Sequence, residues 1–458
     1  MGIVAFMKSF APVLLYSVGL LLALRALSGK TELTLWFLVA LLPLRNIIDR
    51  FHGFPLGKDF VDIVVLTLLL GWGVSTMLRK EKFIEKTPIN GLAVAFILYA
   101  FVSVLQGSSY LQLDSLFSIS DLRVQSWKNF CILPTLFFIT LNNIRTKENV
   151  WRTVVVMCVT MVFMDFYLTR QISWYSGIVS REKIEGTFVF LGPNEIAAFY
   201  TQYTILLIAV FFSLRKKVFK WLLLGLIWVN LFCITFLFSR AAYISLAVGM
   251  FFLFAVKKRI LLVPLVLVAI FWQVALPDKV IERINMTTNE YGELDASAEH
   301  RLIAWQQAMD LFYESPVTGV GYGVFSQMGF RLGDTHNIYM KILAEQGLVG
   351  IFIFLLLVFA FFSQGIKLYL HGDDELSKGL GLGFAICIIV LMVNNIFGDR
   401  WTYMEVSSNL WVFAALVARL NIFSDEAKFK KQVQDNKRSV GTCSIGISKT
   451  PCEIPTRP

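Results

Sequence analysis

Residues 300–350 read HRLIAWQQAMDLFYESPVTGVGYGVFSQMGFRLGDTHNIYMKILAEQGLVG, and they belong to the one long polar interval of an otherwise almost continuously apolar chain. Four apolar side chains of the first part recur at helical spacing, at Leu302, Trp305, Met309 and Phe312. This pattern predicts an amphipathic helix between a cap at Ser297 and the stop signal Ser315-Pro316, with Arg301 at the edge of its apolar stripe.

A glycine-rich turn follows this helix. Gly319, Gly321 and Gly323 predict a turn or a close approach between two segments, because glycine adopts backbone conformations that other residues avoid. The letters VGYG at 320–323 also spell part of a potassium-channel filter. The helix before them is too polar for a re-entrant pore helix, so a channel is a poor interpretation.

The second helix of the stretch begins near His336. Asp334 and Thr335 offer N-caps for it, so its first turn is predicted to carry His336, Asn337 and Tyr339. The positive end of a helix dipole favours the neutral, proton-accepting form of such a histidine, and it also favours anions. A general base beside an anion site is what transfer from a phosphorylated donor to a hydroxyl requires.

The composition indicates a membrane protein. Of the 458 residues, 56% are hydrophobic and 16% are charged, and the mean hydropathy is +0.66, whereas soluble domains carry about 25% charged residues. Successive apolar runs predict an all-α, polytopic helix bundle over residues 1–420. The net charge of +10 needs no nucleic acid to explain it, because Lys and Arg cluster in short loops between the runs.

Twelve or thirteen membrane spans are predicted. The sequence leaves open whether the first apolar run crosses the membrane, and therefore on which side the chain begins. The runs cover about residues 4–24, 33–48, 60–78, 89–105, 130–141, 150–168, 194–214, 219–238, 241–256, 260–276, 348–368, 380–396 and 407–420.

Basic loops set the orientation of the bundle. Four short intervals rich in Lys and Arg, at 79–86, 145–152, 215–220 and 257–259, are each separated from the next by an even number of predicted spans. All four can therefore face the cytoplasm together. The interval 277–347 then faces outward as one large loop, and residues 421–458 form an inward, basic tail that is predicted to be flexible.

Several common chemistries have no signature in the chain. The six cysteines lie in apolar runs or in the tail, so no disulfide framework is implied. No CxxC, HExxH or Walker-type glycine loop occurs, which removes the usual signs of zinc sites and nucleotide hydrolysis. The run HGDDE at 371–375 could coordinate a metal, but a solvated loop is the better interpretation. We therefore predict neither a metal site nor a cofactor.

Three side chains suited to phosphate chemistry are predicted to share the outward face. Arg240 lies in a hairpin with almost no loop, on the same side as Arg301 and His336. Arginine at a span end often only snorkels to the surface, but guanidinium groups also match phosphate oxygens in geometry. The set therefore predicts an anion site. Asn194, at the start of a span, and Arg400, in a short outward turn, are supporting candidates, although a cap and an interfacial anchor would explain them as well.

Polar residues inside the predicted spans leave a transporter as an alternative class of protein. Asp165, Asn230, Asn394 and Asn395 could line a transport path between helices. A transporter would depend on these residues rather than on the outward arginines and histidine.

Five elements of the sequence, taken in order, resemble the signature of the bacterial O-antigen ligase and O-antigen polymerase superfamily. They are Ser239-Arg240-Ala241, His300-Arg301 with Trp305, Pro316 with Gly319 and Gly321, His336-Asn337 with Tyr339, and Glu345 with Gly347 and Gly350. The resemblance is densest over about residues 190–365. It is more specific than any single motif, because separate elements recur in order.

This resemblance implies a GT-C-like glycosyltransferase of the bacterial inner membrane, with its catalytic loop at 277–347 on the periplasmic side. The implied donor is an undecaprenyl-diphosphate-linked glycan, and neither ATP nor a metal is implied. Carried over by position, Arg240 and Arg301 would hold the diphosphate, and His336 would take the proton from the acceptor hydroxyl. The further candidates for substrate contact are Asn194, Asn337, Tyr339 and Arg400.

Two activities within the superfamily stay open. A ligase transfers a finished glycan to a lipid A-core sugar, whereas a polymerase extends the glycan on its own lipid carrier. The outward loop and the arginine-histidine set suit either activity. We place the ligase first.

Overall fold

The computed structural model describes residues 3–175, 184–275, 280–282 and 296–443. Helices and turns account for this part of the chain, which contains no strand, so the predicted all-α bundle is confirmed. Part of the predicted outward loop 277–347 lies outside the described residues, as does the end of the tail.

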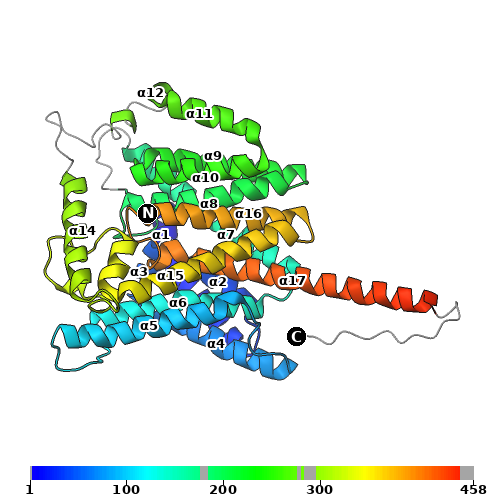
Figure 1. The fold of residues 1–458 in the computed structure, drawn as a ribbon, viewed down its shortest axis with the longest axis horizontal. Helices are drawn as coiled ribbons and strands as arrows, with labels where there is room; N and C mark the ends of the chain where they lie inside the picture. The colour runs from blue at the N-terminus through cyan, green and yellow to red at the C-terminus, as the bar shows by residue number, and fades with distance from the viewer. Residues whose placement is uncertain (1–2, 176–183, 276–279, 283–295, 444–458) are drawn as a thin grey trace.

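Ten helices in the described ranges are long and apolar enough to cross a membrane, which makes this a multi-pass membrane protein (Figure 1). They are α1 (Ile3–Leu27), α4 (Phe60–Arg79), α5 (Pro88–Tyr110), α7 (Lys147–Tyr175), α8 (Pro193–Ser213), α9 (Lys217–Phe236), α10 (Arg240–Lys257), α15 (Ile338–His371), α16 (Glu375–Asn394) and α17 (Met404–Cys443).

The predicted count of twelve or thirteen spans exceeds these ten. The run at 33–48 is divided into α2 (Glu32–Leu41) and α3 (Arg45–Phe51), on either side of Pro43, which lacks an N–H to continue a helix. The run at 260–276 forms only α11 (Leu262–Ile270) and α12 (Trp272–Ala275), and nine residues of helix reach only about 14 Å. The run at 130–141 is part of α6 (Leu122–Asn143), whose first turns are charged.

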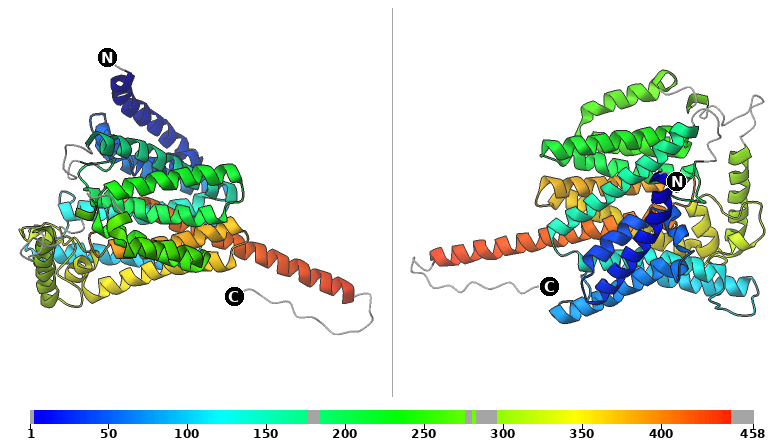
Figure 2. Two further views of the ribbon diagram at one scale, coloured as in Figure 1. Left: turned by 90° about the horizontal axis from the view of Figure 1, so that it is seen from above. Right: turned by 180° about the vertical axis from the view of Figure 1, so that it is seen from behind.

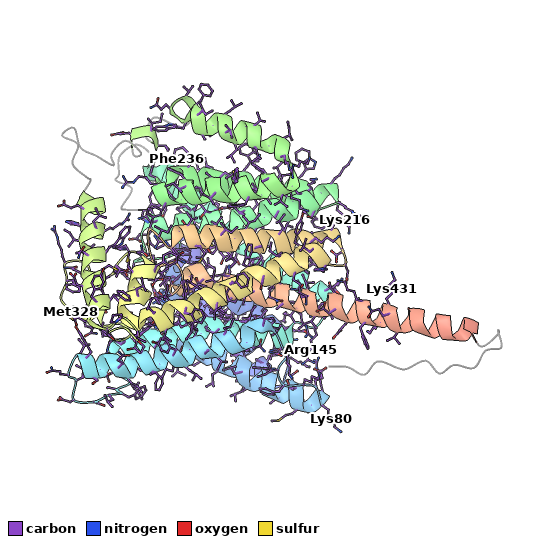
Figure 3. All side chains as sticks on the ribbon, viewed as in Figure 1. Lys80, Arg145, Lys216, Phe236, Met328 and Lys431 are labelled. Carbon is purple, nitrogen blue, oxygen red and sulfur yellow. The ribbon has the colours of Figure 1, made fainter. Side chains whose placement is uncertain are left out.

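The basic loops gather at one end of the bundle. Figure 3 shows Lys80, Arg145, Lys216 and Lys431 at this end, whereas Met328, in the predicted outward interval, lies at the opposite end. The loops of Lys80, Arg145 and Lys216 therefore share one end, as the sequence predicts. The end with the basic loops is called the basic end below, and the other end, which the sequence predicts to face outward, is called the outward end.

Helices α8 and α16 lie at the centre of the bundle beside α17, whose spanning window is 89% buried. In their spanning windows, 89% of α8 and 72% of α16 are buried inside the protein. Small residues allow the two helices to approach closely: a Cβ added to Gly383 would lie 3.0 Å from the backbone oxygen of Leu206. Because α8 is surrounded by other helices, its position in the bundle is fixed by packing along most of its length. Its first turn lies at the outward end.

The amphipathic helix predicted from the polar stretch is α14 (Ala296–Glu314). It lies across the outward end of the bundle instead of running along the spans (Figures 1 and 2). Ala304, Ala308 and Leu311 bury its apolar side against the glycine-rich segment and the start of α15. The polar stretch therefore covers the outward end and brings α14 to the first turn of α15.

The first part of the predicted basic tail is helical. Helix α17 continues past the bundle to Cys443 and projects from the basic end (Figure 1). Its side chains at 425–434 are exposed, and Asp425 pairs with Lys367 at 2.7 Å. The residues after 443 lie outside the described part.

Candidate functional site

The glycine-rich segment inserts between two membrane helices. Gly319, Gly321 and Gly323 all have positive φ, at 74°, 124° and 74°, as a close-approach segment requires. Gly321 packs on α5, where an added Cβ would lie 2.1 Å from the Cα of Gly107. Tyr322 N–H donates to the backbone oxygen of Ser103 on the same helix at 3.0 Å. The predicted close approach is confirmed.

The same segment is hydrogen-bonded to α15 where that helix is broken. Gly347 interrupts α15 with φ of 63°, which frees backbone oxygens upstream of the break. Val320 N–H donates to Ala344 O and Gly321 N–H to Glu345 O, both at 2.9 Å. Downstream, Leu348 N–H donates to Pro316 O at 2.9 Å. The segment thus replaces the missing helical hydrogen bonds and fixes the first two turns of α15.

His336 precedes this helix and is not in its first turn, so the predicted N-caps at Asp334 and Thr335 are wrong. The helix begins at Ile338, and Asn337 is the N-cap. Its Oδ1 accepts from the backbone N–H of Tyr339 at 2.9 Å and of Met340 at 3.3 Å. Asp334, Thr335 and Asn337 all have side-chain oxygens that can cap a helix, so residue type alone does not identify the N-cap.

The turn that carries His336 is rigid. His336 adopts φ of 49°, in the left-handed region that non-glycine residues seldom occupy. Thr335 is fully buried, and its hydroxyl donates to the backbone oxygen of Asn337 at 2.8 Å. The imidazole itself remains 40% exposed. A strained backbone therefore presents a solvent-accessible histidine at the outward end.

Helix α14 contacts this turn through Trp305. The indole Nε1–H donates to the backbone oxygen of Thr335 at 3.0 Å. Arg301 lies one helical turn before Trp305 and therefore on the same face of α14. The contact brings the helix of Arg301 to the turn of His336, although the two residues are 35 positions apart in the chain.

An acidic residue accompanies His336. Asp334 Oδ2 lies 3.6 Å from the Nδ1 of His336, and the Asp334 side chain is 24% exposed. The sequence prediction used Asp334 only as a cap and missed this pairing.

Arg240 is the first residue of α10, where the α9–α10 hairpin turns at the outward end. Ser239, the N-cap of α10, does not cap with its side chain. Its hydroxyl instead donates to the Oδ1 of Asn194 on α8, at 2.9 Å. Asn194 is thus tied directly to the residue before Arg240.

The turn between α16 and α17 links the starts of α8 and α15 through two ion pairs. Arg400 is buried, and its guanidinium lies 2.6 Å from the carboxylate of Glu195 on α8. Asp399 is also buried and accepts from the Nζ of Lys341 on α15 at 3.0 Å. Burial alone would raise the pKa of Asp399, but the Lys341 ammonium and hydrogen bonds from Thr402 hold it below its usual range.

Two of the predicted substrate contacts face the protein interior. The hydroxyl of Tyr339 donates to the backbone oxygen of Met392 at 2.9 Å, and its ring packs edge-on against Phe354. Arg400 is oriented toward Glu195. These side chains hold helices together, whereas Arg240, Arg301 and His336 are only partly buried.

A buried arginine on the outward side was not predicted. Arg123, at the start of α6, is buried beside Gly323 and bonds to Asp121 and, at 2.7 Å, to the hydroxyl of Ser108. The hydrogen bond from Arg123 lowers the pKa of Asp121. The spacing DxR at 121–123 was the available signal, because aspartate is a common N-cap and here caps α6.

Three of the four polar residues that suggested transport, Asp165, Asn230 and Asn394, are hydrogen-bonded to neighbouring helices. Asn230, with its amide nitrogen toward Asp165, donates to both carboxylate oxygens at 3.1 Å. Asn394 donates to Thr201 at 3.1 Å and accepts from Ser245 at the same distance. These hydrogen bonds join α7 to α9 and α8 to α10 and α16, so they account for Asp165, Asn230 and Asn394 as helix contacts.

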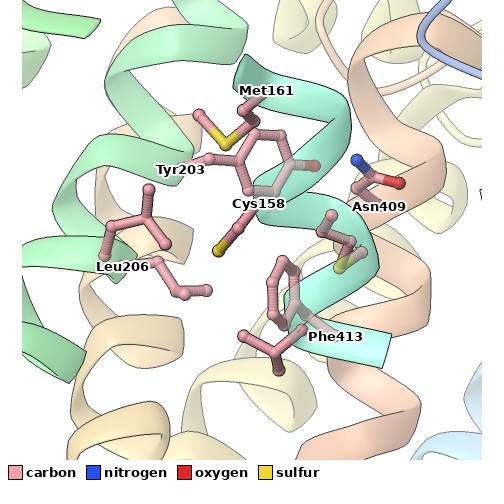
Figure 4. A pocket seen from close by; sticks show the side chains of 9 residues that line it. Cys158, Met161, Tyr203, Leu206, Asn409 and Phe413 are labelled. Carbon is pink, nitrogen blue, oxygen red and sulfur yellow. The ribbon is translucent and has the colours of Figure 1, made fainter. Parts of the chain in front are cut away.

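A small cavity lies between α7, α8 and α17, away from the predicted site residues (Figure 4). Its volume of about 10 Å³ has room for no more than one water molecule. Cys158, Met161, Tyr203 and Phe413 give it a largely apolar lining, with Asn409 at one side. Among the described residues, no group of three or more His, Cys, Asp or Glu side chains is placed to hold a metal ion.

The architecture is that of a polytopic membrane protein with a histidine and two arginines at its outward end. Residues 225–355, which include all three, match the family model described as O-antigen ligase. A Rickettsia conorii protein provisionally named a polysaccharide ligase is 25% identical over 146 residues, which cover 28% of this chain and 34% of that relative. These findings support the O-antigen ligase superfamily, so the resemblance predicted from the sequence is confirmed.

Proposed function

We propose that this protein is a membrane glycosyltransferase of the O-antigen ligase type. It transfers a glycan from an undecaprenyl-diphosphate carrier to a hydroxyl of lipid A-core, at the periplasmic face of the bacterial inner membrane. The observation that carries the proposal is the hydrogen bond from Trp305 to Thr335. It brings the helix of Arg301 to the turn of His336, within the segment that matches the O-antigen ligase family.

The proposed reaction needs a base and positive charge, and the three residues supply both. His336 accepts the proton of the acceptor hydroxyl while the acceptor oxygen bonds to the anomeric carbon of the donor sugar. The bond from that carbon to the diphosphate oxygen breaks, most simply with inversion. Arg240 and Arg301 stabilise the negative charge on the departing lipid diphosphate. Because arginines fill this role, a chelator is expected to leave the rate unchanged.

The other predicted site residues have supporting roles in this proposal. Asn337 caps the helix beside His336, and Asn194 is bonded to the residue before Arg240. Tyr339 and Arg400 fasten α15 and α8 to the turn that follows α16. We therefore assign these four residues to positioning rather than to direct contact with the substrates.

The decisive experiment uses purified protein with an undecaprenyl-diphosphate-linked glycan, in parallel reactions with and without lipid A-core. Wild type is compared with His336→Ala and with a control, His371→Ala, whose side chain is exposed at the basic end. A product on the core acceptor that only His336→Ala abolishes supports a ligase. A ladder of longer lipid-linked glycans without acceptor would instead identify a polymerase.

A transporter would give a different pattern. Under that alternative, no product would depend on His336 with any donor, and substitution of Asn230 or Asn394 would abolish function while Arg301→Ala and His336→Ala are tolerated. The hydrogen bonds that join these asparagines to neighbouring helices favour a packing role for them. Size-exclusion profiles of all variants show whether a loss of activity is only a loss of folding.

A further inference from the structure

We propose that Asp334 is the positioning residue for His336, and that the pair acts as a carboxylate–imidazole dyad. This inference rests on the proposed function, in which His336 is the general base. The carboxylate fixes the imidazole so that Nδ1 carries the hydrogen and Nε2 faces the acceptor hydroxyl.

The geometry supplies the first argument. Asp334 Oδ2 lies 3.6 Å from His336 Nδ1, and catalytic hydrogen bonds are often this long before the substrate is bound. The second oxygen, Oδ1, is buried without a hydrogen-bond partner among the described residues. The carboxylate caps no helix in this structure, because Asn337 caps α15. Asp334 is therefore available to the imidazole.

The turn holds the two side chains in place from both sides. Thr335, between them, is fully buried and accepts the indole N–H of Trp305 on its backbone oxygen. Its hydroxyl bonds to the backbone oxygen of Asn337. His336 is kept at φ of 49° by these contacts. Asp334 and His336, on either side of the buried Thr335, therefore place their side chains close together. The left-handed backbone of His336 is part of this geometry.

The charged groups near Asp334 include one cation on α15, and that cation has another acidic partner. Lys341 is the cation of α15 closest in sequence, and Asp334 acts on it electrostatically. However, Asp399 already lies 3.0 Å from the Lys341 ammonium and neutralises it. Glu345 and Tyr403 also lie within the electrostatic range of Asp334, and neither adds a positive charge. The negative charge of Asp334 can therefore act on His336, whose Nδ1 lies 3.6 Å away.

The dyad has a defined chemical effect. When His336 takes the acceptor proton on Nε2, the imidazole becomes an imidazolium with a hydrogen on each nitrogen. Asp334 then forms a charge-assisted hydrogen bond to Nδ1–H and stabilises this cation without taking its proton. The same bond excludes the tautomer in which Nε2 carries the hydrogen and could not act as a base.

The first test separates kcat from KM. Asp334→Asn removes the charge and is expected to lower kcat by about tenfold or more, within the roughly 10²–10⁴-fold that a general base contributes in total. The donor KM should change little, because Asp334 is not assigned to the diphosphate. Asp334→Glu should restore part of the rate. Asp310→Asn, which removes an exposed acid of the same outward region, is the matched control.

The second test does not depend on transfer activity. Diethyl pyrocarbonate labels neutral imidazole, and mass spectrometry reports its rate at His336 separately from the other three histidines. At pH 8 we expect Asp334→Asn to label His336 severalfold more slowly than wild type, because no carboxylate then holds the hydrogen on Nδ1 and leaves Nε2 free to react. Asp334→Ala repeats the measurement if the asparagine variant does not fold.

The outcomes distinguish this inference from the proposed function. If wild type transfers glycan but Asp334→Asn is as active and labels as fast, the dyad is refuted and the proposed function stands. If wild type transfers nothing with any donor, the proposed function fails. The labelling rate of His336 then still tests the pairing of Asp334 with His336. Slower labelling in Asp334→Asn than in wild type supports the pairing, and equal rates in the two proteins refute it.

Discussion

The indole of Trp305 and the backbone oxygen of Thr335 are joined by a hydrogen bond of 3.0 Å. This bond links α14, which lies across the outward end of the bundle, directly to the turn that precedes α15. Because Arg301 is one helical turn from Trp305, the bond sets how the arginine and His336 are placed relative to each other. A reaction that uses both residues should therefore depend on a tryptophan that need not touch the substrate.

Trp305→Phe tests this dependence. The substitution keeps most of the aromatic volume but removes the N–H donor, at a cost of about 1 kcal/mol, the typical net value of one hydrogen bond. We expect roughly a fivefold loss of transfer rate with a nearly unchanged unfolding temperature. Trp228→Phe is the control, because that side chain is exposed on the outer surface of α9. Equal rates for both variants would show that the bond does not position the site.

The glycine-rich segment makes a second prediction. Gly321 has φ of 124°, and an added Cβ would meet the backbone of Gly107 at 2.1 Å. Gly321→Ala should therefore separate the segment from α5, at a cost of about 1–3 kcal/mol or more. Gly333→Ala, where an added Cβ has nothing within 4 Å, is the control. Thermal unfolding in detergent should show a lower unfolding temperature for Gly321→Ala alone, and a wild-type value would contradict the packing argument.

These glycines also show what the sequence could predict. Three glycines at alternate positions can be recognised as a close-approach segment because positive φ is a local property of the residue type. The polar interval between apolar runs similarly predicted that the candidate site residues lie at one end of the bundle. The helical continuation of α17 was not predicted, because the basic composition of residues 421–458 was interpreted as a flexible tail. Residues 425–440 contain neither glycine nor proline, which could have indicated that the helix continues.

The roles of Arg400 and Asp334 could not be predicted from the sequence, because both depend on tertiary contacts. The partner of Arg400, Glu195, is 205 residues away, and no local pattern reveals that such an arginine is buried. Asp334 and Asn337 are equally good caps by residue type, so the helix start and the pairing of Asp334 follow only from the fold. The residue types of this segment predict a turn before the helix. Which partner each polar side chain of the turn bonds to depends on the tertiary contacts.

The buried pair of Arg400 and Glu195 gives a third prediction. Removing one partner leaves an uncompensated buried charge, so Arg400→Leu or Glu195→Leu should each cost about 3–5 kcal/mol. Removing both partners should cost much less than the sum of the two single losses. Unfolding temperatures of the four proteins in a double-mutant cycle measure the coupling. Losses that simply add would mean that the two residues stabilise α8 and α17 separately.

Asp121 predicts how stability depends on pH. The hydrogen bond from Arg123 lowers the pKa of Asp121 in the folded protein, so the unfolded chain binds the proton more readily. The pair therefore contributes its full stability above the ordinary carboxyl value of about 3.9, and this contribution is lost as the pH falls through the lower folded value. The gap in unfolding temperature between wild type and Asp121→Asn should be constant from pH 7 to pH 5 and should narrow below pH 4. A gap that persists unchanged at pH 3 would contradict this assignment.

The hydrogen bond between Ser239 and Asn194 should govern how firmly Arg240 is held. Its loss in Ser239→Ala or Asn194→Ala frees the start of α10 relative to α8, so the donor KM should rise severalfold if Arg240 binds the diphosphate. Because each substitution breaks the same bond, the double variant should be little worse than either single variant. Donor titrations at saturating acceptor measure all four KM values. If the two increases in the free energy of binding add in the double variant, the side chains act independently and another contact must position Arg240.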